Sequence, residues 1–245
     1  MKKNISKKIL NLIGIIIIFS SVSCSGKNEA NIEVERLSNI AKEVSIIRDD
    51  YGVPHIYGKT DAQAVFGLLY AQAEDDFPRI ERNYILAIGR LAEIEGEKAL
   101  YSDLRARLFM TIEEAQMAYE SAPEWLRALC NAFADGLNFY LASHPEVTPK
   151  LITHFEPWMP MFFFECSIGG DIEQIPTAGI ESFYGANQDY IASSKSDPIK
   201  TGFDEPKGSN CFAISGEHTA SGNAMFLINP HTSFYFRGEV HVVSD

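Results

Sequence analysis

The stretch KGSNCFAISGEHTASGNAMFLINPH, residues 207–231, decides how the C-terminal part of this chain folds. Two apolar runs, 211–214 and 224–228, flank a polar turn. This pattern predicts two buried strands of a hairpin, at about 211–216 and 224–229. Ser209 follows Gly208 and stands where the first strand begins. On its own, a Gly-Ser-Asn sequence before a strand is most often a turn.

The same position also suits a self-cleaving bond. Residues 193–208 have the composition of an exposed linker, which would present the Gly208–Ser209 bond at the edge of the strand pair. Glycine leaves room for the strained geometry in which a serine hydroxyl attacks the preceding carbonyl. After cleavage Ser209 would carry a free α-amine with a pKa of about 7.7–8.0, which can take the hydroxyl proton. The alternatives at this point are a turn serine and a nucleophile.

The composition is that of a globular protein. The chain has 245 residues, 46% of them hydrophobic, so it is long enough for one large domain or two small ones. The formal net charge is −12, and a surface of this sign repels nucleic acid phosphates and anionic membranes. We therefore expect no nucleic acid partner.

Residues 1–23 are predicted to be a signal peptide. A lysine-rich start precedes an apolar core, residues 9–19, that is too short to span a bilayer. The following SVSC, residues 21–24, resembles the lipobox of bacterial lipoproteins, which implies lipidation of Cys24. Ser21 stands where an aliphatic residue is usual, so cleavage as a plain secretory signal is the alternative. Both predict export to the periplasm or cell envelope, with membrane contact only through a lipid anchor.

The other three cysteines are odd in number and have no CxxC spacing. We expect Cys130, Cys166 and Cys211 to be buried small apolar residues rather than metal ligands or disulfides.

Further elements follow from local patterns. Residues 24–42 are predicted to be a polar tether ending in a short helix. Strands at 44–48 and 53–57 around the turn DDYG predict a hairpin. Helices are expected at these places: residues 61–73 after the N-cap Thr60, a second helix from about Pro78 to Ile94 ended by Gly96, residues 111–119, and residues 123–142.

Five separated segments give the chain a resemblance to a known family. They are IIRDDYGVPHIYG (46–58), FGLLYAQAEDDFPRIERN (66–83), GRLAEIEG (89–96), FADGLNFYL (133–141) and GSNCFAISGEHTASGNAMFLINPH (208–231). In this order and spacing they resemble the penicillin acylase family. The resemblance implies an α+β fold, the αββα sandwich of N-terminal-nucleophile hydrolases. It also implies an exported precursor cut into two chains that hydrolyses linear amides.

Several residues match the family's motifs. Ser209 matches the nucleophile, Gly208 the residue on the other side of the cut, and His231 the histidine that helps to orient the serine. A lone histidine after a proline can equally be a hydrogen-bonded structural residue, and His55 is interpreted as structural. Glu181 matches a carboxylate that binds structural calcium in penicillin G acylases, although calcium takes six or more oxygen ligands.

The resemblance divides the chain into regions. After the signal peptide and the tether, residues 43–192 correspond to the α-chain, 193–208 to the spacer and 209–245 to the start of the β-chain. Family members continue well beyond the nucleophile, so the chain is expected to be a fragment whose sandwich is incomplete. Such a fragment would lack the oxyanion-hole donors and be inactive alone, with a downstream β-chain segment as its partner.

Two functions follow from the sequence. The first is an amidase for an N-acyl substrate such as a β-lactam side chain, an acyl-homoserine lactone or a lipopeptide, with a role in antibiotic metabolism. Thr232 stands where characterised members place Phe or Leu in the acyl pocket, so their acyl preference does not transfer. The alternative is a catalytically inactive envelope lipoprotein that binds amides.

Overall fold

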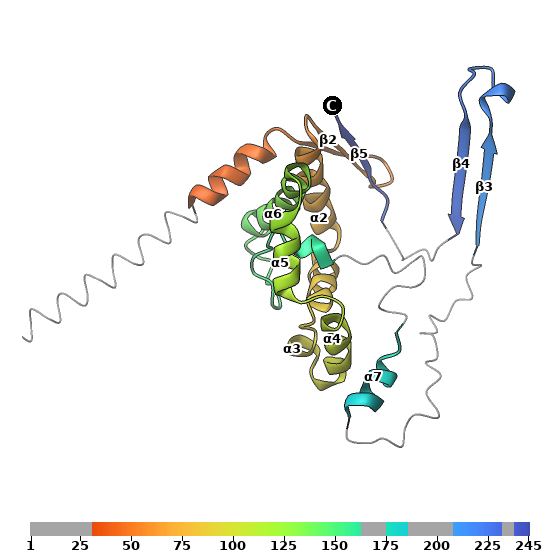
Figure 1. The fold of residues 1–245 in the computed structure, drawn as a ribbon. Coiled ribbons are helices and arrows are strands. Elements are labelled where there is room, and N and C mark those ends of the chain that lie inside the picture. Colours follow the sequence, from red (N-terminus) through yellow and green to blue (C-terminus); the bar gives the residue numbers. More distant parts are fainter. Residues whose placement is uncertain (1–30, 163–174, 186–207, 232–237) are drawn as a thin grey trace, which may run out of the picture. The chain divides into compact units, whose positions relative to one another are not determined.

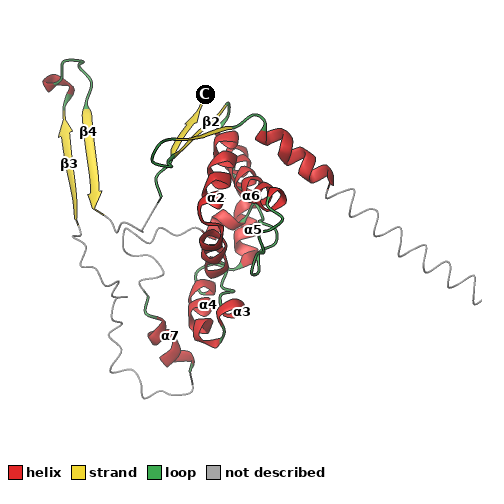
Figure 2. Ribbon diagram, turned by 180° about the vertical axis from the view of Figure 1, so that it is seen from behind, coloured by secondary structure: helices red, strands yellow, loops and turns green. Residues whose placement is uncertain are grey.

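The computed structural model describes residues 31–162, 175–185, 208–231 and 238–245. The chain divides into two compact units, Met1–Ala186 with Val240–Asp245, and Asn187–Glu239. Figures 1 and 2 show the elements of each unit. The sequence grouped residues 209–245 together, whereas the structure joins the last strand to the first unit.

The first unit contains a three-stranded sheet. Strands β1 (Ser45–Arg48) and β2 (Pro54–Gly58) form the predicted antiparallel hairpin. Asp49 shapes the turn, because its Oδ1 accepts the N–H groups of Tyr51 and Val53, each at 2.9 Å. Strand β5 (His241–Ser244), which the sequence did not predict, pairs with β2 in parallel. The strand order is β1-β2-β5.

Helix α2 (Asp61–Ala87) follows the sheet. Thr60 caps it as predicted, since its side chain accepts the N–H of Gln63 at 3.2 Å. The two predicted helices are continuous except for a kink at Asp76, which has a non-helical φ of −159° and ψ of 66°. Pro78 lies in the turn after this kink, where a missing N–H costs least.

The prediction that this helical segment continues to Ile94 was wrong. Helix α2 ends at Ala87, and the short helix α3 (Ala92–Glu95) starts anew before Gly96. Gly89, with a φ of 67°, stops α2. Buried Asp103 then accepts the N–H groups of Leu91 and Ala92, both at 2.7 Å. These bonds supply the first turn of α3 with the acceptors that helix starts lack.

The remaining helices of this unit follow in the chain, and α4 and α6 contact α2 directly. A 3-10 turn η1 (Glu97–Ala99) leads into α4 (Leu100–Arg107). The predicted α5 (Ile112–Ser121) and α6 (Glu124–Ser143) are confirmed, and Thr111 with Glu114 forms a capping box at the start of α5. The 3-10 turn η2 (Met159–Phe162) and helix α7 (Thr177–Tyr184) follow.

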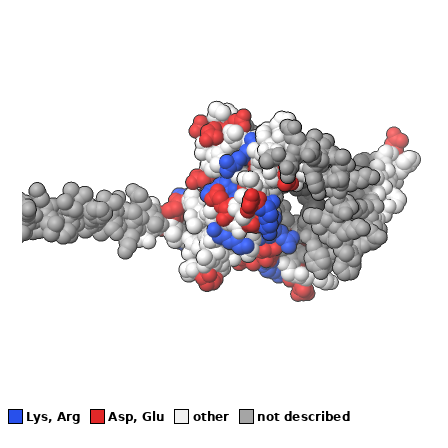
Figure 3. Space-filling view, turned by 90° about the horizontal axis from the view of Figure 1, so that it is seen from below, with Lys and Arg blue, Asp and Glu red and all other residues white. Residues whose placement is uncertain are grey.

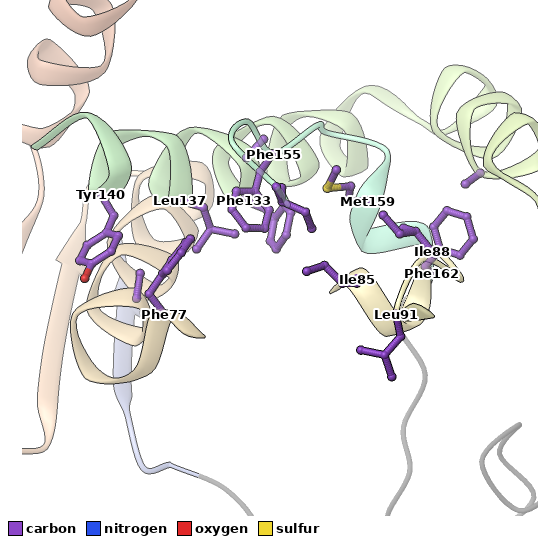
Figure 4. Packing of buried hydrophobic residues seen from close by; sticks show 14 of the residues in the cluster. Phe77, Ile85, Ile88, Leu91, Phe133, Leu137, Tyr140, Phe155, Met159 and Phe162 are labelled. Carbon is purple, nitrogen blue, oxygen red and sulfur yellow. The ribbon is translucent and has the colours of Figure 1, made fainter. Parts of the chain in front are cut away.

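The main core lies between α2, α6 and the segment 152–162 (Figure 4). Phe77, Ile85, Leu137 and Phe155 are each at most 3% exposed. Gly136 allows the close crossing of α2 and α6, since a Cβ at this position would lie 2.4 Å from the carbonyl oxygen of Phe66.

Helical residues 31–41 are part of this unit's packing. Leu37 is 2% exposed and clusters with Phe66 and Ala132. Arg36 pairs with Asp135 of α6, with Nη1 to Oδ2 at 2.8 Å, and also with Glu33. The tether predicted for 24–42 therefore includes a helix that contacts α6.

The second unit contains a two-stranded hairpin. Strands β3 (Gly208–Ile214) and β4 (Met225–His231) pair antiparallel as predicted, with a 3-10 turn η5 (Gly216–His218) between them. The predicted burial of these strands was wrong: Phe212, Phe226 and Cys211 are exposed. Among the described residues this sheet has two strands. Cys130, in contrast, is buried as predicted.

The described residues thus contain both helices and sheets, in line with an α+β chain, while the complete αββα sandwich stays a prediction. The signal peptide, Cys24, Cys166, Thr232 and nearly all of the spacer 193–208 lie outside the described residues. No helix in the described ranges has the length and apolar character to cross a membrane. The face seen in Figure 3 carries acidic and basic side chains intermixed.

Candidate active site

The residues matched to the cleavage site stand at one end of the β3–β4 hairpin. Gly208 is the first residue of β3 and lies opposite His231, the last residue of β4. Ser209 is the next residue and pairs with Pro230. Backbone pairing therefore brings the predicted nucleophile, the predicted cut and the predicted histidine to the same end of one hairpin.

His231 is held by two amides. Its Nε2 lies 3.3 Å from Nδ2 of Asn210 and 3.4 Å from Nδ2 of Asn229. An amide nitrogen donates, so Nε2 accepts in this arrangement and the imidazole proton is assigned to Nδ1. Asn210 and Asn229 pair with each other two residues further along the ladder than Gly208 and His231. The three polar side chains therefore share one face of the hairpin.

Ser209 belongs to the other face. Successive residues of a strand point to opposite sides, and Ser209 stands between Gly208 and Asn210. Its side chain is exposed in this unit. If His231 takes part in cleavage, it would therefore act from its position opposite Gly208, beside the Gly208 carbonyl. It would not act from the face that carries the Ser209 hydroxyl.

Glu181, the predicted calcium ligand, is an exposed residue of α7. Within the described ranges, no group of three or more His, Cys, Asp or Glu residues is arranged to hold a metal ion. One carboxylate does not provide the six or more oxygens that calcium takes. The described residues thus do not form a calcium site by themselves, and calcium binding stays a prediction.

The sequence did not predict a second polar group, in which His55 and His241 are in contact. His55 of β2 pairs with His241 of β5, and their Nδ1 atoms are 3.1 Å apart. Asp49 lies on the other side of His55, with Oδ2 3.4 Å from Nε2. Burial raises the pKa of Asp49, but hydrogen bonds from the N–H groups of Val53 and Tyr51 and from His55 outweigh it and lower the pKa overall. The only sequence signal was the short apolar run after His241.

Comparison with known proteins places these residues in a family. The family model described as penicillin amidase matches residues 43–241. The chain is 31% identical over 116 residues to the acyl-homoserine lactone acylase QuiP of Pseudomonas fluorescens, which covers 47% of this chain and 14% of that protein. It is 31% identical over 121 residues to penicillin G acylase of Escherichia coli, covering 47% and 14% of the two chains.

Two further proteins match this chain. The penicillin acylase 2 proenzyme of Pseudomonas sp. strain SE83 is 27% identical over 127 residues, which is 51% of this chain and 16% of that protein. A solved penicillin G acylase from Alcaligenes faecalis superposes with a TM-score of 0.47 at 20% identity, covering 63% of this chain and 95% of that chain. The matched part of this chain thus spans only a small part of the curated relatives.

The family match includes the paired end of the hairpin, Gly208, Ser209 and His231, as well as the β1–β2 hairpin and the helices of the first unit. Since it extends over most of the sequence, the chain belongs to the penicillin amidase family.

Proposed function

We propose that this chain is part of an exported amidohydrolase that cleaves the linear amide bond of an N-acyl compound, with Ser209 as its N-terminal nucleophile. The observation that carries the proposal is the position of Ser209. It follows Gly208 at the start of β3, across from His231, within the segment that matches the family. The names of the relatives suggest acyl-homoserine lactones and penicillins as substrate classes, and so a role in antibiotic metabolism.

Activation would begin with self-cleavage. The Ser209 hydroxyl attacks the carbonyl carbon of Gly208, the C–N bond breaks, and the Ser209 nitrogen takes a proton to become a free α-amine. The resulting ester between Gly208 and the Ser209 oxygen is then hydrolysed by water. The products are a chain that ends in the Gly208 carboxylate and a chain that begins with Ser209.

Substrate hydrolysis would use the hydroxyl and the new α-amine of Ser209. The α-amine of Ser209 accepts the hydroxyl proton, directly or through one water, while the oxygen attacks the substrate carbonyl. The amine part of the substrate leaves with a proton, and water then cleaves the acyl ester. An α-amine pKa of about 7.7–8.0 suits this task near neutral pH.

Export is proposed from the sequence of residues 1–24. The lysine-rich start and apolar core would direct the chain across the inner membrane, and Cys24 would carry the lipid if the lipobox is used. The protein would then act in the periplasm or at the cell envelope.

Hydrolysis of a chromogenic N-acyl anilide tests the proposal. The protein expressed from its natural gene is compared with its Ser209→Ala variant and with Ser215→Ala, a matched control at an exposed serine after β3. We expect Ser215→Ala to keep the turnover and Ser209→Ala to lose it. Equal turnover by both variants would overturn the assignment of Ser209. Binding of amides without any turnover by the wild-type protein would support the inactive envelope lipoprotein instead.

A further inference from the structure

His55 of β2 and His241 of β5 are two titratable side chains in direct contact. They are direct partners in the parallel ladder, and their rings meet edge to face with centroids 5.0 Å apart. Ile56, the next residue of β2, is fully buried, and a Cβ on Gly67 of α2 would lie 2.7 Å from its Cγ2. The two histidines therefore lie on the face of the sheet that points away from α2.

The contact needs one shared proton. Two Nδ1 atoms 3.1 Å apart attract each other only when one donates and the other accepts. Because a carboxylate can only accept, the contact of His55 Nε2 with Asp49 Oδ2 places a proton on Nε2. The Nδ1 of neutral His55 is then the acceptor, and the Nδ1 of His241 is the donor.

We propose that His55 and His241 act as a proton-sharing clasp that fixes β5 on β2 near neutral pH and releases it when both imidazoles are protonated. A doubly protonated pair places two N–H donors and two positive charges against each other. The contact then changes from an attraction to a repulsion. Because the change is the uptake of a second proton by the pair, it is driven by a fall in pH.

Other charged groups around the sheet are engaged elsewhere. Arg48 pairs with Asp75 at 2.9 Å and Glu74 at 3.1 Å, and Lys59 pairs with Glu43 at 2.6 Å. Asp61 of α2 accepts the hydroxyl of Ser244 in β5. Two other titratable residues belong to these strands or follow them directly, Tyr57 and Asp245. The ring centroid of Tyr57 is 6.1 Å from that of His241. Asp49 is the carboxylate with a described polar contact to the pair.

The clasp has a consequence that rests on the proposed function. Strand β2 precedes the Gly208–Ser209 bond in the chain, and β5 follows it. After the proposed cut the two strands belong to different products. The edge of β2 is thus an interaction surface whose partner is the segment that follows the new N-terminus, and the histidine pair fixes the register of their pairing.

Histidine titration tests the clasp without any dependence on cleavage. The Ser209→Ala form of the 245-residue chain keeps both strands in one polypeptide. Its ¹⁵N-labelled imidazoles are followed by NMR, together with amide hydrogen exchange of residues 241–244, expressed as protection factors at pH 7.5 and pH 5. We expect His55 and His241 to titrate in two coupled steps, and β5 protection to fall about tenfold or more at the acidic pH.

Asparagine variants provide the controls. His241→Asn keeps an amide near the position of Nδ1 but does not titrate, so β5 protection should become the same at both pH values while His55 titrates in one step. His144→Asn, in contact with Tyr140 of α6, should leave the pH effect unchanged. Protection of α6 amides reports whether each variant is folded. Independent titration of His55 and His241, or β5 protection that is equal at both pH values in the Ser209→Ala chain, would overturn the clasp and leave the function of Ser209 untouched.

Discussion

His231 stands directly opposite Gly208 in the β3–β4 ladder, whereas Ser209 is paired with Pro230. The histidine therefore belongs to the face that carries Asn210 and Asn229, and it is next to the carbonyl side of the proposed cut. This register separates Ser209, the proposed nucleophile, from the histidine by strand alternation, although they are close along the hairpin.

The first prediction concerns His231. Because it borders the carbonyl of the proposed cut, we expect His231→Ala to slow cleavage after Gly208 by about 10²-fold, the low end for removing one group that stabilises an attacked carbonyl. His218→Ala, at an exposed histidine in the turn between the strands, should cleave at the wild-type rate. The rate is measured by the appearance of the new N-terminus over time. Equal rates for the two variants would show that the end of β4 has no part in cleavage.

The second prediction concerns the nucleophile atom. Ser209→Cys should keep at least part of the self-cleavage, because a thiolate can attack the Gly208 carbonyl, while Ser209→Ala should stop it. Gel electrophoresis after incubation at neutral pH separates the cut and uncut chains. Cysteine and alanine variants that both remain uncut would argue that cleavage depends on more than a nucleophile at this position.

The third prediction concerns the crossing of α2 and α6. Alanine usually stabilises a helix relative to glycine by about 0.5–1 kcal/mol, but at Gly136 the new Cβ would lie 2.4 Å from the Phe66 oxygen. We expect overpacking to dominate, so that Gly136→Ala lowers the free energy of unfolding by about 1–3 kcal/mol. Gly179→Ala in α7, with nothing within 4 Å of its Cβ, is the control and should be neutral or stabilising. Chemical denaturation gives both values, and equal effects would refute the close approach.

The fourth prediction concerns the docking of residues 31–41. The hydrogen bond from Arg36 lowers the pKa of Glu33. Burial raises this pKa, and the positive charge of Arg36 lowers it further, so the pKa is lowered overall. A depressed pKa contributes stability above the unfolded value of about 4.3, and this stability is lost as the pH falls through the folded pKa. Amide protection of 31–41 should therefore be pH-independent between 6 and 8 and fall below about pH 4.

A variant separates the ion pairs from other acid effects. Arg36→Gln should weaken this docking at neutral pH by about 0.5–1 kcal/mol, as expected for partly exposed ion pairs. Arg127→Gln, at an exposed arginine that donates to the carbonyl of Glu120, is the control. If protection of 31–41 is the same in both variants, Leu37 and its apolar neighbours hold the helix without help from Arg36.

Local signals predicted the parts of the fold that depend on neighbouring residues. Thr60 and Thr111 mark helix starts because their hydroxyls satisfy N–H groups three residues on, and Asp49 marks a turn in the same way. The end of α2 is marked locally by Gly89, with a φ of 67°, but the new start of α3 was missed because Asp103, sixteen residues beyond Ala87 in sequence, supplies its acceptors. Such long-range acceptors leave no trace in a local pattern.

The candidate site was predictable to a different degree. The resemblance predicts roles for Ser209, Gly208 and His231, which stay predictions, and the hairpin pattern predicted the ladder that joins them, which the structure confirms. The parallel pairing of β5 with β2 could not be predicted, because four residues give little periodicity and the partner strand lies far earlier in the chain. The exposure of Cys211 was missed because its strand pattern shows an apolar face without showing what covers it.

The proposed function depends on Ser209 becoming an N-terminal nucleophile by self-cleavage. Intact mass spectrometry with N-terminal sequencing of the protein expressed from its natural gene measures this most directly. We expect a chain beginning with Ser209 in the wild type at neutral pH and a single uncut chain in Ser209→Ala. A wild-type protein that stays uncut, or a Ser209→Ala variant that is cut at the same bond, would contradict it.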